Sequence, residues 1–190
     1  ENARYLSMTL PYAAGSLIST VEDLWKWNQA LHSYKLVSKE SLQKAFTDYK
    51  LSDGKSTRYG YGWSFGDVQG NATIEHGGGI NGFVTDGVYL PAEDIFVAVF
   101  ANCDCRSLDM LAPKMAALTL GKPYDQKEIA INEAMAKEYT GVYENESWEQ
   151  RIITAEGTKL TSQRAGGSKY RIKPYEKDKF FFENSLSLLR

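Results

Sequence analysis

Three consecutive glycines, Gly77 to Gly79, follow a histidine and separate two apolar runs of this 190-residue chain. Thr73-Ile74 lies before them and Phe83-Val84 lies after them. Glycine weakens the interior of a strand unless a ligand or another backbone must approach closely. The pattern therefore indicates a strand edge against which a substrate lies, or a glycine hairpin whose histidine is satisfied locally. A short motif remains a hypothesis until its context agrees.

The overall composition excludes some classes of function. Lysine and arginine number 22 and aspartate and glutamate 24, a near balance that argues against nucleic acid or an anionic membrane as partner. The longest apolar run, Ile95 to Ala101, is too short to span a bilayer. The length suits one domain, or one domain with a small appendage. The chain begins with Glu1 and looks like a piece cut from a longer protein, so a missing signal peptide says nothing about the parent.

Apolar periodicity predicts two helices and then an antiparallel sheet. Hydroxyl caps predict helices that begin at Ser19-Thr20 and at Ser38. Turn signals such as Gly66-Asp67 then separate short aromatic and β-branched runs, which predict strands at 59–65, 72–76, 83–90 and 95–102. Residues 95–101 do not alternate in polarity, so we expect both faces of that strand to be covered. A helix from about Ser107 would cover one of them.

A change of pattern near Lys122 divides the chain in two. Glycine and proline there predict a boundary between residues 1–122 and a second unit of residues 123–190. The second unit is expected to begin with a helix at 128–137 and to continue as small strands at 151–154, 159–162, 170–174 and 179–183. The segment from Phe180 to Asn184 looks like a strand whose partner has been cut away.

Cys103 and Cys105 are the two cysteines of the chain. With one residue between them a mutual disulfide would be strained, because Cα positions and sulfur directions must suit each other. Two sulfurs without a histidine nearby in the sequence also make a poor zinc site. We therefore predict two free thiols at the end of a buried strand.

Three short motifs have a catalytic form. The segment Gly62 to Gly66 matches the nucleophile elbow of α/β-hydrolases around Ser64, but an elbow joins a strand to a helix, and no histidine follows His76 to complete a triad. Ser41 and Lys44 have the spacing of a serine with an amine base, but they lie on what we predict to be a solvated helix. Tyr143-Glu144-Asn145 has a Tyr-x-Asn form in the second unit, where a strand end and turn are expected. A complete small hydrolase that uses Ser64 remains an alternative.

Several segments occur in a characteristic order, namely Ala14 to Leu24, Tyr61-Gly62-Trp63, His76-Gly77-Gly78, Gly82-Phe83, Leu90-Pro91 and Ala101-Asn102. Together they resemble the C-terminal half of the serine β-lactamase and penicillin-binding-protein superfamily, in the branch of class C β-lactamases, DD-peptidases and related esterases. The resemblance covers about residues 11 to 120. It implies an α+β fold, in which an incomplete β-lactamase/transpeptidase-like antiparallel sheet with packed helices precedes a small all-β domain.

The resemblance also implies roles for the glycine cluster. In the family a Lys-Thr-Gly triplet lies on the strand that lines the active site, and His76, Gly77 and Gly78 occupy its place here. His76 would contact the hydrogen-bond network of the nucleophile or a substrate carboxylate, and the backbone N–H of Gly79 would be an oxyanion-hole donor. Gly77, Gly78 and Asn102 would bind substrate. No metal and no cofactor is implied.

The family's Ser-x-x-Lys helix and Tyr-x-Asn motif lie upstream of Ala14, so the resemblance implies one wall of an active site without its nucleophile. Such a piece is expected to be inactive by itself. The parent is expected to be a serine hydrolase that forms an acyl-enzyme with a small peptide, ester or β-lactam-like substrate. The histidine in place of lysine, and Gly77 in place of threonine or serine, favour a peptidase or esterase over a β-lactamase. The alternative is a non-catalytic penicillin-binding-like module that binds a ligand or a peptidoglycan peptide.

The missing N-terminal half of the same protein is the first partner that the resemblance implies. Its strands would pair beside residues 95–101, and without them this open edge predicts self-association. The segment Tyr139 to Tyr143 resembles the start of the small β-rich extension found in many members, which we expect to be a packing appendage. The resemblance also implies an extracytoplasmic parent, either periplasmic or secreted.

Overall fold

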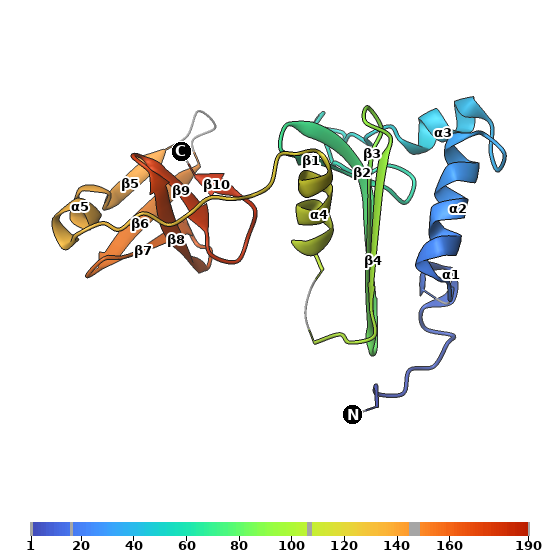
Figure 1. Ribbon diagram of the computed structural model, residues 1–190, viewed down its shortest axis with the longest axis horizontal. Coiled ribbons are helices and arrows are strands. Elements are labelled where there is room, and N and C mark those ends of the chain that lie inside the picture. Colours follow the sequence, from blue (N-terminus) through green and yellow to red (C-terminus); the bar gives the residue numbers. More distant parts are fainter. Residues whose placement is uncertain (1, 16, 106–107, 145–148, 190) are drawn as a thin grey trace. The chain divides into compact units, whose positions relative to one another are not determined.

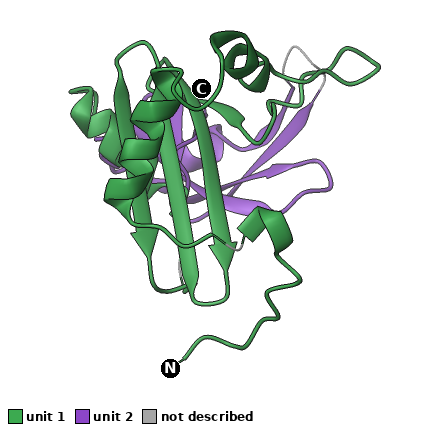
Figure 2. Ribbon diagram, turned by 90° about the vertical axis from the view of Figure 1, so that its right-hand side faces the viewer, with its two compact units in different colours: residues 1–123 green, residues 124–190 purple. Residues whose placement is uncertain are grey.

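The structure, a computed structural model, describes residues 2–15, 17–105, 108–144 and 149–189. The chain forms two compact units, residues 1–123 and 124–190, which Figure 2 shows in different colours. The first contains a four-stranded sheet with helices, and the second contains a six-stranded sheet. All neighbouring strands are antiparallel. The α+β class predicted from the sequence is therefore confirmed.

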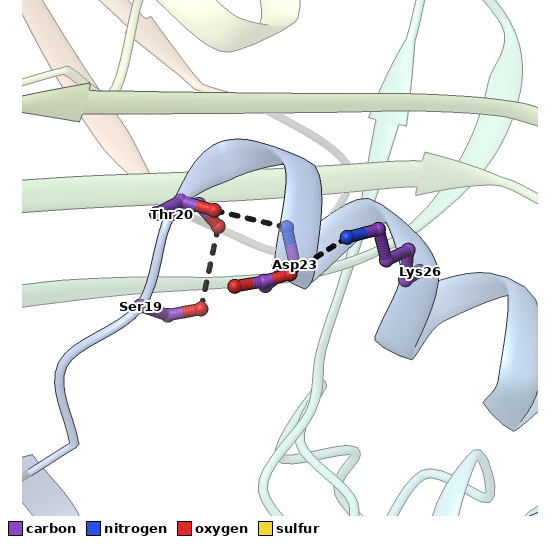
Figure 3. Close-up of polar contacts among 4 residues, drawn as sticks. All are labelled: Ser19, Thr20, Asp23 and Lys26. Atoms are coloured by element: carbon purple, nitrogen blue, oxygen red, sulfur yellow. Dashed lines mark hydrogen bonds and ion pairs between the residues drawn. The ribbon is translucent and has the colours of Figure 1, made fainter.

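The first unit begins with helices α1 (Tyr12–Gly15), α2 (Val21–His32) and α3 (Lys39–Ala45). Thr20 caps α2, because its hydroxyl oxygen accepts a hydrogen bond from the N–H of Asp23 at 3.1 Å (Figure 3). The Asp23 carboxylate also pairs with Lys26 at 3.0 Å. Ser38 caps α3 in the same way through the N–H of Ser41. Each such cap stabilises its helix by about 1 kcal/mol, and both lie where the sequence predicted them.

The sheet of the first unit contains strands β1 (Ser64–Val68), β2 (Asn71–Ile80), β3 (Phe83–Leu90) and β4 (Ile95–Ala101) in the order β1-β2-β3-β4. Helices α2 and α4 (Leu111–Thr119) lie on opposite sides of it, and both contact β4 (Figure 1). His32 of α2 lies against Tyr89, with ring centroids 3.9 Å apart. Because side chains alternate along a strand, the neighbouring Val88 and Leu90 face α4. The cover predicted for both faces of β4 is present.

Each face of the sheet is packed by a different kind of side chain. On the α4 side the core is aliphatic and consists of the buried residues Val68, Val88, Leu90, Val97, Leu108, Ala112, Ala116 and Ala117. On the α2 side, Trp27 stacks on Trp63, which meets the edge of Phe46. The three small alanines allow α4 to lie close to the sheet, while the aromatic rings fill the wider space under α2.

The second unit contains α5 (Glu133–Glu138) and six strands: β5 (Gly141–Glu144), β6 (Gln150–Glu156), β7 (Lys159–Arg164), β8 (Lys169–Glu176), β9 (Lys179–Phe182) and β10 (Leu188–Leu189). The strands follow one another in the sheet in chain order. Its core is formed by Ala136 of α5 and by Ile153, Leu160, Ile172 and Phe180. Strand β9 pairs with β10 as well as with β8, so the expectation that its partner had been cut away was wrong.

Two helices begin later than the sequence predicted. Helix α4 begins at Leu111, whose N–H donates to the carbonyl of Leu108 in a preceding turn, and the predicted start at Ser107 lies outside the described residues. Helix α5 begins at Glu133 and not at residue 128, because Asn132 caps it through the N–H of Met135 at 2.9 Å. Upstream of that cap, residues 124–131 are not helical, and the N–H of Ile129 donates to the carbonyl of Pro174 at 2.9 Å.

The sequence predicted a turn at Gly66-Asp67, but these two residues belong to β1, where they pair with Thr73 and Ala72. The reversal comes at Gln69-Gly70, and both residues have positive φ. Such angles suit a two-residue hairpin, and glycine adopts them without steric cost. The strand therefore extends three residues beyond the predicted end at Phe65.

Cys103 and Cys105 form a disulfide, so the prediction of two free thiols was wrong. The chain bends after β4, and the two Cα atoms lie 5.2 Å apart. This separation is within the range that a disulfide spans, although only one residue intervenes.

Candidate active site

Strand β2 runs through the whole glycine cluster, so the structure favours the strand interpretation over the glycine hairpin. The turn comes afterwards, at Asn81-Gly82, where Gly82 has a φ of 82°. Strand β1 pairs with β2 only as far as Glu75. From His76 onward β2 has β3 on one side and, within the described residues, no strand on the other.

The hairpin geometry determines which backbone groups face this open edge. Two residues connect Ile80 to its partner Phe83, and the pair that closes such a loop is hydrogen-bonded. Antiparallel pairs alternate between bonded and non-bonded, so Gly77 and Gly79 direct their N–H and C=O groups away from β3. The same alternation directs the backbone of Glu75 toward β1, where Glu75 pairs with Ser64. The N–H of Gly79 therefore points to the open edge beyond the end of β1.

The fold itself does not require glycine at Gly77 or Gly79. Neither residue has a positive φ, and an added Cβ would meet nothing closer than 3.5 Å at Gly77 or 3.9 Å at Gly79. Gly78 differs, because a Cβ there would lie 2.7 Å from the hydroxyl oxygen of Thr85. The missing side chains at Gly77 and Gly79 leave the strand backbone accessible to a ligand.

An open cleft of about 450 Å³ lies against the glycines. It is lined by Gly77, Gly78, Gly79, Val84, Thr85, Asp104, Leu108 and Asp109. Gly77 and Gly79 belong to the face of the sheet that carries α4, and the last three lining residues come from the segment between β4 and α4. The cleft is thus built entirely within the first unit.

Acidic side chains gather on the same face of the sheet. Asp86 lies opposite Gly77 in the pairing of β2 with β3. Burial, and after it the carboxylates of Glu75 and Asp109, together raise the pKa of the Asp86 carboxyl to about 6. Glu75 accepts a hydrogen bond from the hydroxyl of Thr73 at 2.8 Å. Near neutral pH this side of the glycine strand is therefore negatively charged.

The side chain of His76 lies on the other face, since its neighbour Gly77 faces α4. Its Nδ1 is 2.6 Å from the carbonyl oxygen of Gly77, and its Nε2 is 2.8 Å from the hydroxyl oxygen of Tyr59. A carbonyl oxygen only accepts, so Nδ1 carries the proton in the neutral ring and Nε2 accepts from Tyr59. His76 is thus held at both nitrogens.

The structure brings together some of the residues singled out in the sequence. Gly77, Gly78 and Gly79 line one cleft, whereas His76 is not among its lining residues. Asn102, the other residue expected to bind substrate, is exposed directly after β4 and also lies outside the lining.

Among the described residues, the three alternative motifs show no catalytic arrangement. Ser64 opens β1 and leads into a strand, so it is not on an elbow. Ser41 lies exposed on α3, and its hydroxyl contacts Ser38. Among the described residues, no hydrogen bond joins either serine hydroxyl to His76. Tyr143 lies in β5, and Asn145 falls outside the described residues.

Sequence reasoning missed Tyr59 and Asp86. Tyr59 precedes His76 by 17 residues, and only the folding of the intervening segment brings the two together. Asp86 could have been found by pairing the two runs around Asn81-Gly82, because that hairpin sets it against Gly77.

The described residues contain no group of three or more His, Cys, Asp or Glu side chains that could hold a metal ion. Within the same ranges, every helix is too short or too polar to cross a lipid bilayer.

Part of the chain matches a known protein family, and known proteins resemble it in sequence and fold. Residues 1–119 match the family model described as Beta-lactamase. The chain is 25% identical over 177 residues to Penicillin-binding protein 4* of Bacillus subtilis (strain 168), with 88% of this chain and 39% of that protein covered. The octameric penicillin-binding protein homologue from Pyrococcus abyssi is a similar solved structure, with a TM-score of 0.51 and 25% identity over 86% of this chain and 40% of that one. The chain thus spans about 40% of the length of these relatives.

Proposed function

This chain belongs to the β-lactamase family, and we propose that it supplies the active-site strand of a serine hydrolase whose nucleophile lies outside residues 1–190. The reaction would be acyl transfer from a small peptide, ester or β-lactam-like substrate to that serine, followed by hydrolysis of the acyl-enzyme. The observation that carries the proposal is the N–H of Gly79, which the β2–β3 register directs to an open strand edge beside a cleft.

The chemical role of this N–H follows from how a carbonyl reacts. When a hydroxyl attacks, the carbonyl oxygen gains negative charge that exists only in the transition state and the tetrahedral intermediate. A fixed backbone donor aimed at that oxygen lowers the barrier by about 3 kcal/mol. Because Gly79 has no side chain, and an added Cβ would meet nothing closer than a Val84 methyl at 3.9 Å, a substrate can approach the backbone there closely.

Two observations support a nucleophile outside the chain. The aligned parts cover 39% and 40% of the two relatives, so most of their length has no counterpart here. Within the chain, Ser64 begins a strand and Ser41 is exposed on a helix, each without a hydrogen bond to His76 in the described structure.

A fluorophosphonate probe followed by intact-mass spectrometry tests the location of the serine. We expect no adduct on this chain, and one adduct, on a serine upstream of Glu1, in a protein that also carries the upstream segment. An adduct on Ser64 or Ser41 would overturn the proposal, because the chain would then contain its own nucleophile. No adduct in the longer protein would also overturn it and would favour a module that binds a ligand without reacting.

The variant Gly79→Pro tests the oxyanion role in the longer protein. Proline removes the N–H of residue 79, and this position contributes no ladder hydrogen bond to β3, so the strand should tolerate it. We expect the acylation rate to fall about 100- to 1000-fold with the fold retained. Gly78→Pro is the structural contrast, because it removes a ladder hydrogen bond and should lower stability. An acylation rate close to wild type for Gly79→Pro would contradict the assigned role.

A further inference from the structure

The contact between Tyr59 and His76 has a definite direction. Because the Gly77 carbonyl accepts a hydrogen bond from Nδ1–H, the lone pair of the neutral ring is on Nε2, and the Tyr59 hydroxyl donates to it at 2.8 Å. An unconstrained imidazole can carry its proton on either nitrogen. Here the Gly77 carbonyl selects the Nδ1–H tautomer, and the Tyr59 hydroxyl, which can donate or accept but is the stronger donor, adds to that preference at Nε2.

The surrounding loop fixes Tyr59 independently of His76. Its backbone N–H donates to the Asp48 carboxylate at 3.3 Å, and its carbonyl accepts from the N–H of Tyr49 at 2.9 Å. Tyr59 also forms an isolated antiparallel bridge with Ser64 at the start of β1. The tyrosine ring then meets the imidazole edge-on, with centroids 5.8 Å apart and an interplanar angle of 65°. The loop between α3 and β1 therefore presents the hydroxyl to the histidine.

We propose that Tyr59 is a positioning residue for His76, which it holds as the Nδ1–H tautomer with Nε2 as the one ring atom that can gain a proton. A catalytic role for this tautomer rests on the proposed function, whereas the assignment of the tautomer itself does not depend on that function. In an acyl-transfer site the arrangement would allow His76 to act only through Nε2, and the Tyr59 hydroxyl would control access to that atom.

Nitrogen-15 NMR of this chain tests the proposal directly, since the chain has only two histidines, His32 and His76. Long-range proton–nitrogen spectra of the neutral rings distinguish the two tautomers. We expect His76 to be mainly the Nδ1–H form in the wild type. In Tyr59→Phe, loss of one hydrogen bond should lower the ratio of the Nδ1–H to the Nε2–H form about five-fold.

Tyr61→Phe is the matched control, because Tyr61 lies two residues further on and is 79% exposed. This variant should keep the wild-type ratio for His76, and His32 should keep its own ratio in both variants. If Tyr59→Phe does not fold, 3-fluorotyrosine incorporated at the 12 tyrosines provides a second measurement. Its hydroxyl is a stronger donor, so the ratio for His76 should rise. A wild-type ring in the Nε2–H form, or a ratio unchanged by loss or strengthening of the donor, would overturn the proposal.

The proposed function is tested by a different measurement, namely the rate of acylation in the protein that carries the upstream segment. In that protein Tyr59→Phe should change the pH profile of acylation more than Tyr61→Phe does. A changed tautomer ratio with no acylation at all would keep the positioning role and reject the hydrolase.

Discussion

Gly77 lies directly opposite Asp86 across β2 and β3, and a Cβ on Gly77 would stand 3.6 Å from the carboxylate oxygen Oδ1 of Asp86. A half-buried carboxyl group thus lies immediately beside the open glycine strand. Its pKa is raised to about 6, chiefly by burial and further by the carboxylates of Glu75 and Asp109. The charge beside the cleft therefore changes in a range of pH that is easily reached.

We predict that Asp86→Asn raises stability near neutral pH. A carboxyl whose pKa is higher in the folded state than the ordinary value for aspartate binds its proton more readily when folded. The protonated Asp86 carboxyl therefore contributes to the free energy of unfolding of the wild type at low pH, and this contribution is lost as pH rises from about 4 to about 6. Above pH 6 the free energy of unfolding of the variant should exceed that of the wild type by about 1–2 kcal/mol, and below pH 4 the two should be equal. This figure is already reduced for solvent screening of the partly exposed group. Urea unfolding at a series of pH values measures the difference.

Asp48→Asn is a control of opposite sign. Hydrogen bonds from Ser56, and from the backbone of Tyr59 and Arg58, lower the pKa of the Asp48 carboxyl. Its contribution to stability is therefore present at neutral pH and is lost as pH falls below the ordinary range of an aspartate. Removing it should destabilise the chain at neutral pH. If both variants shifted stability in the same direction, the environments assigned to these two carboxyls would be incorrect.

Hydrophobic patterning and capping residues predicted most of the first unit. Thr20 and Ser38 cap α2 and α3 where their hydroxyls indicated, and the run from Ile95 to Ala101 forms β4. The errors came from glycines and from competing caps. Gly66 looked like a turn residue but pairs within β1, and Asn132 begins a helix that periodicity alone placed at residue 128. Pairing across strands decides such positions, and it is not visible in a local window.

The candidate site was predicted only in part, because its geometry depends on strand alternation. The sequence indicated His76 and Gly79 together, but alternation places the His76 side chain on one face and directs the Gly79 backbone to the strand edge. The partner of His76 comes from a loop 17 residues away. Long-range contacts of this kind follow from the fold as a whole, so no local sequence motif predicts that Tyr59 contacts His76.

We predict that substitution by alanine destabilises the fold at one glycine of the first unit and hardly changes its stability at another. A Cβ at Gly60 would lie 2.3 Å from the carbonyl oxygen of Ala45 and 2.9 Å from that of Thr47, and backbone atoms cannot move aside cheaply. Gly60→Ala should therefore cost at least about 2 kcal/mol. Gly79→Ala, whose nearest neighbour would be a Val84 methyl at 3.9 Å, should stay within about 0.5 kcal/mol of the wild type. Thermal and urea unfolding compare them, and equal losses would contradict the open space described at Gly79.

We predict that the two cores respond separately to truncation. Leu90 is fully buried in the first unit, and Leu160 is 1% exposed in the second. Leu90→Ala and Leu160→Ala should each cost about 3 kcal/mol, because each leaves a cavity in a packed core. Differential scanning calorimetry should show each substitution lowering the midpoint of a different transition. A single transition lowered equally by both would mean that the units unfold together.

We propose, finally, that the chain associates through β4, and we expect sedimentation velocity to show species larger than a monomer at micromolar concentration. Strand β4 ends the sheet order β1-β2-β3-β4, so one side of its backbone has no strand partner in the described structure. Its residues are apolar throughout, and an exposed apolar edge is a template for pairing with a second copy. Val99→Lys places a charge in this strand and should shift the chain toward monomer. Val142→Lys makes the same change in β5, the edge of the other sheet, and should sediment like the wild type. A wild-type chain that remains monomeric, or one in which only Val142→Lys disrupts association, would reject β4 as the interface.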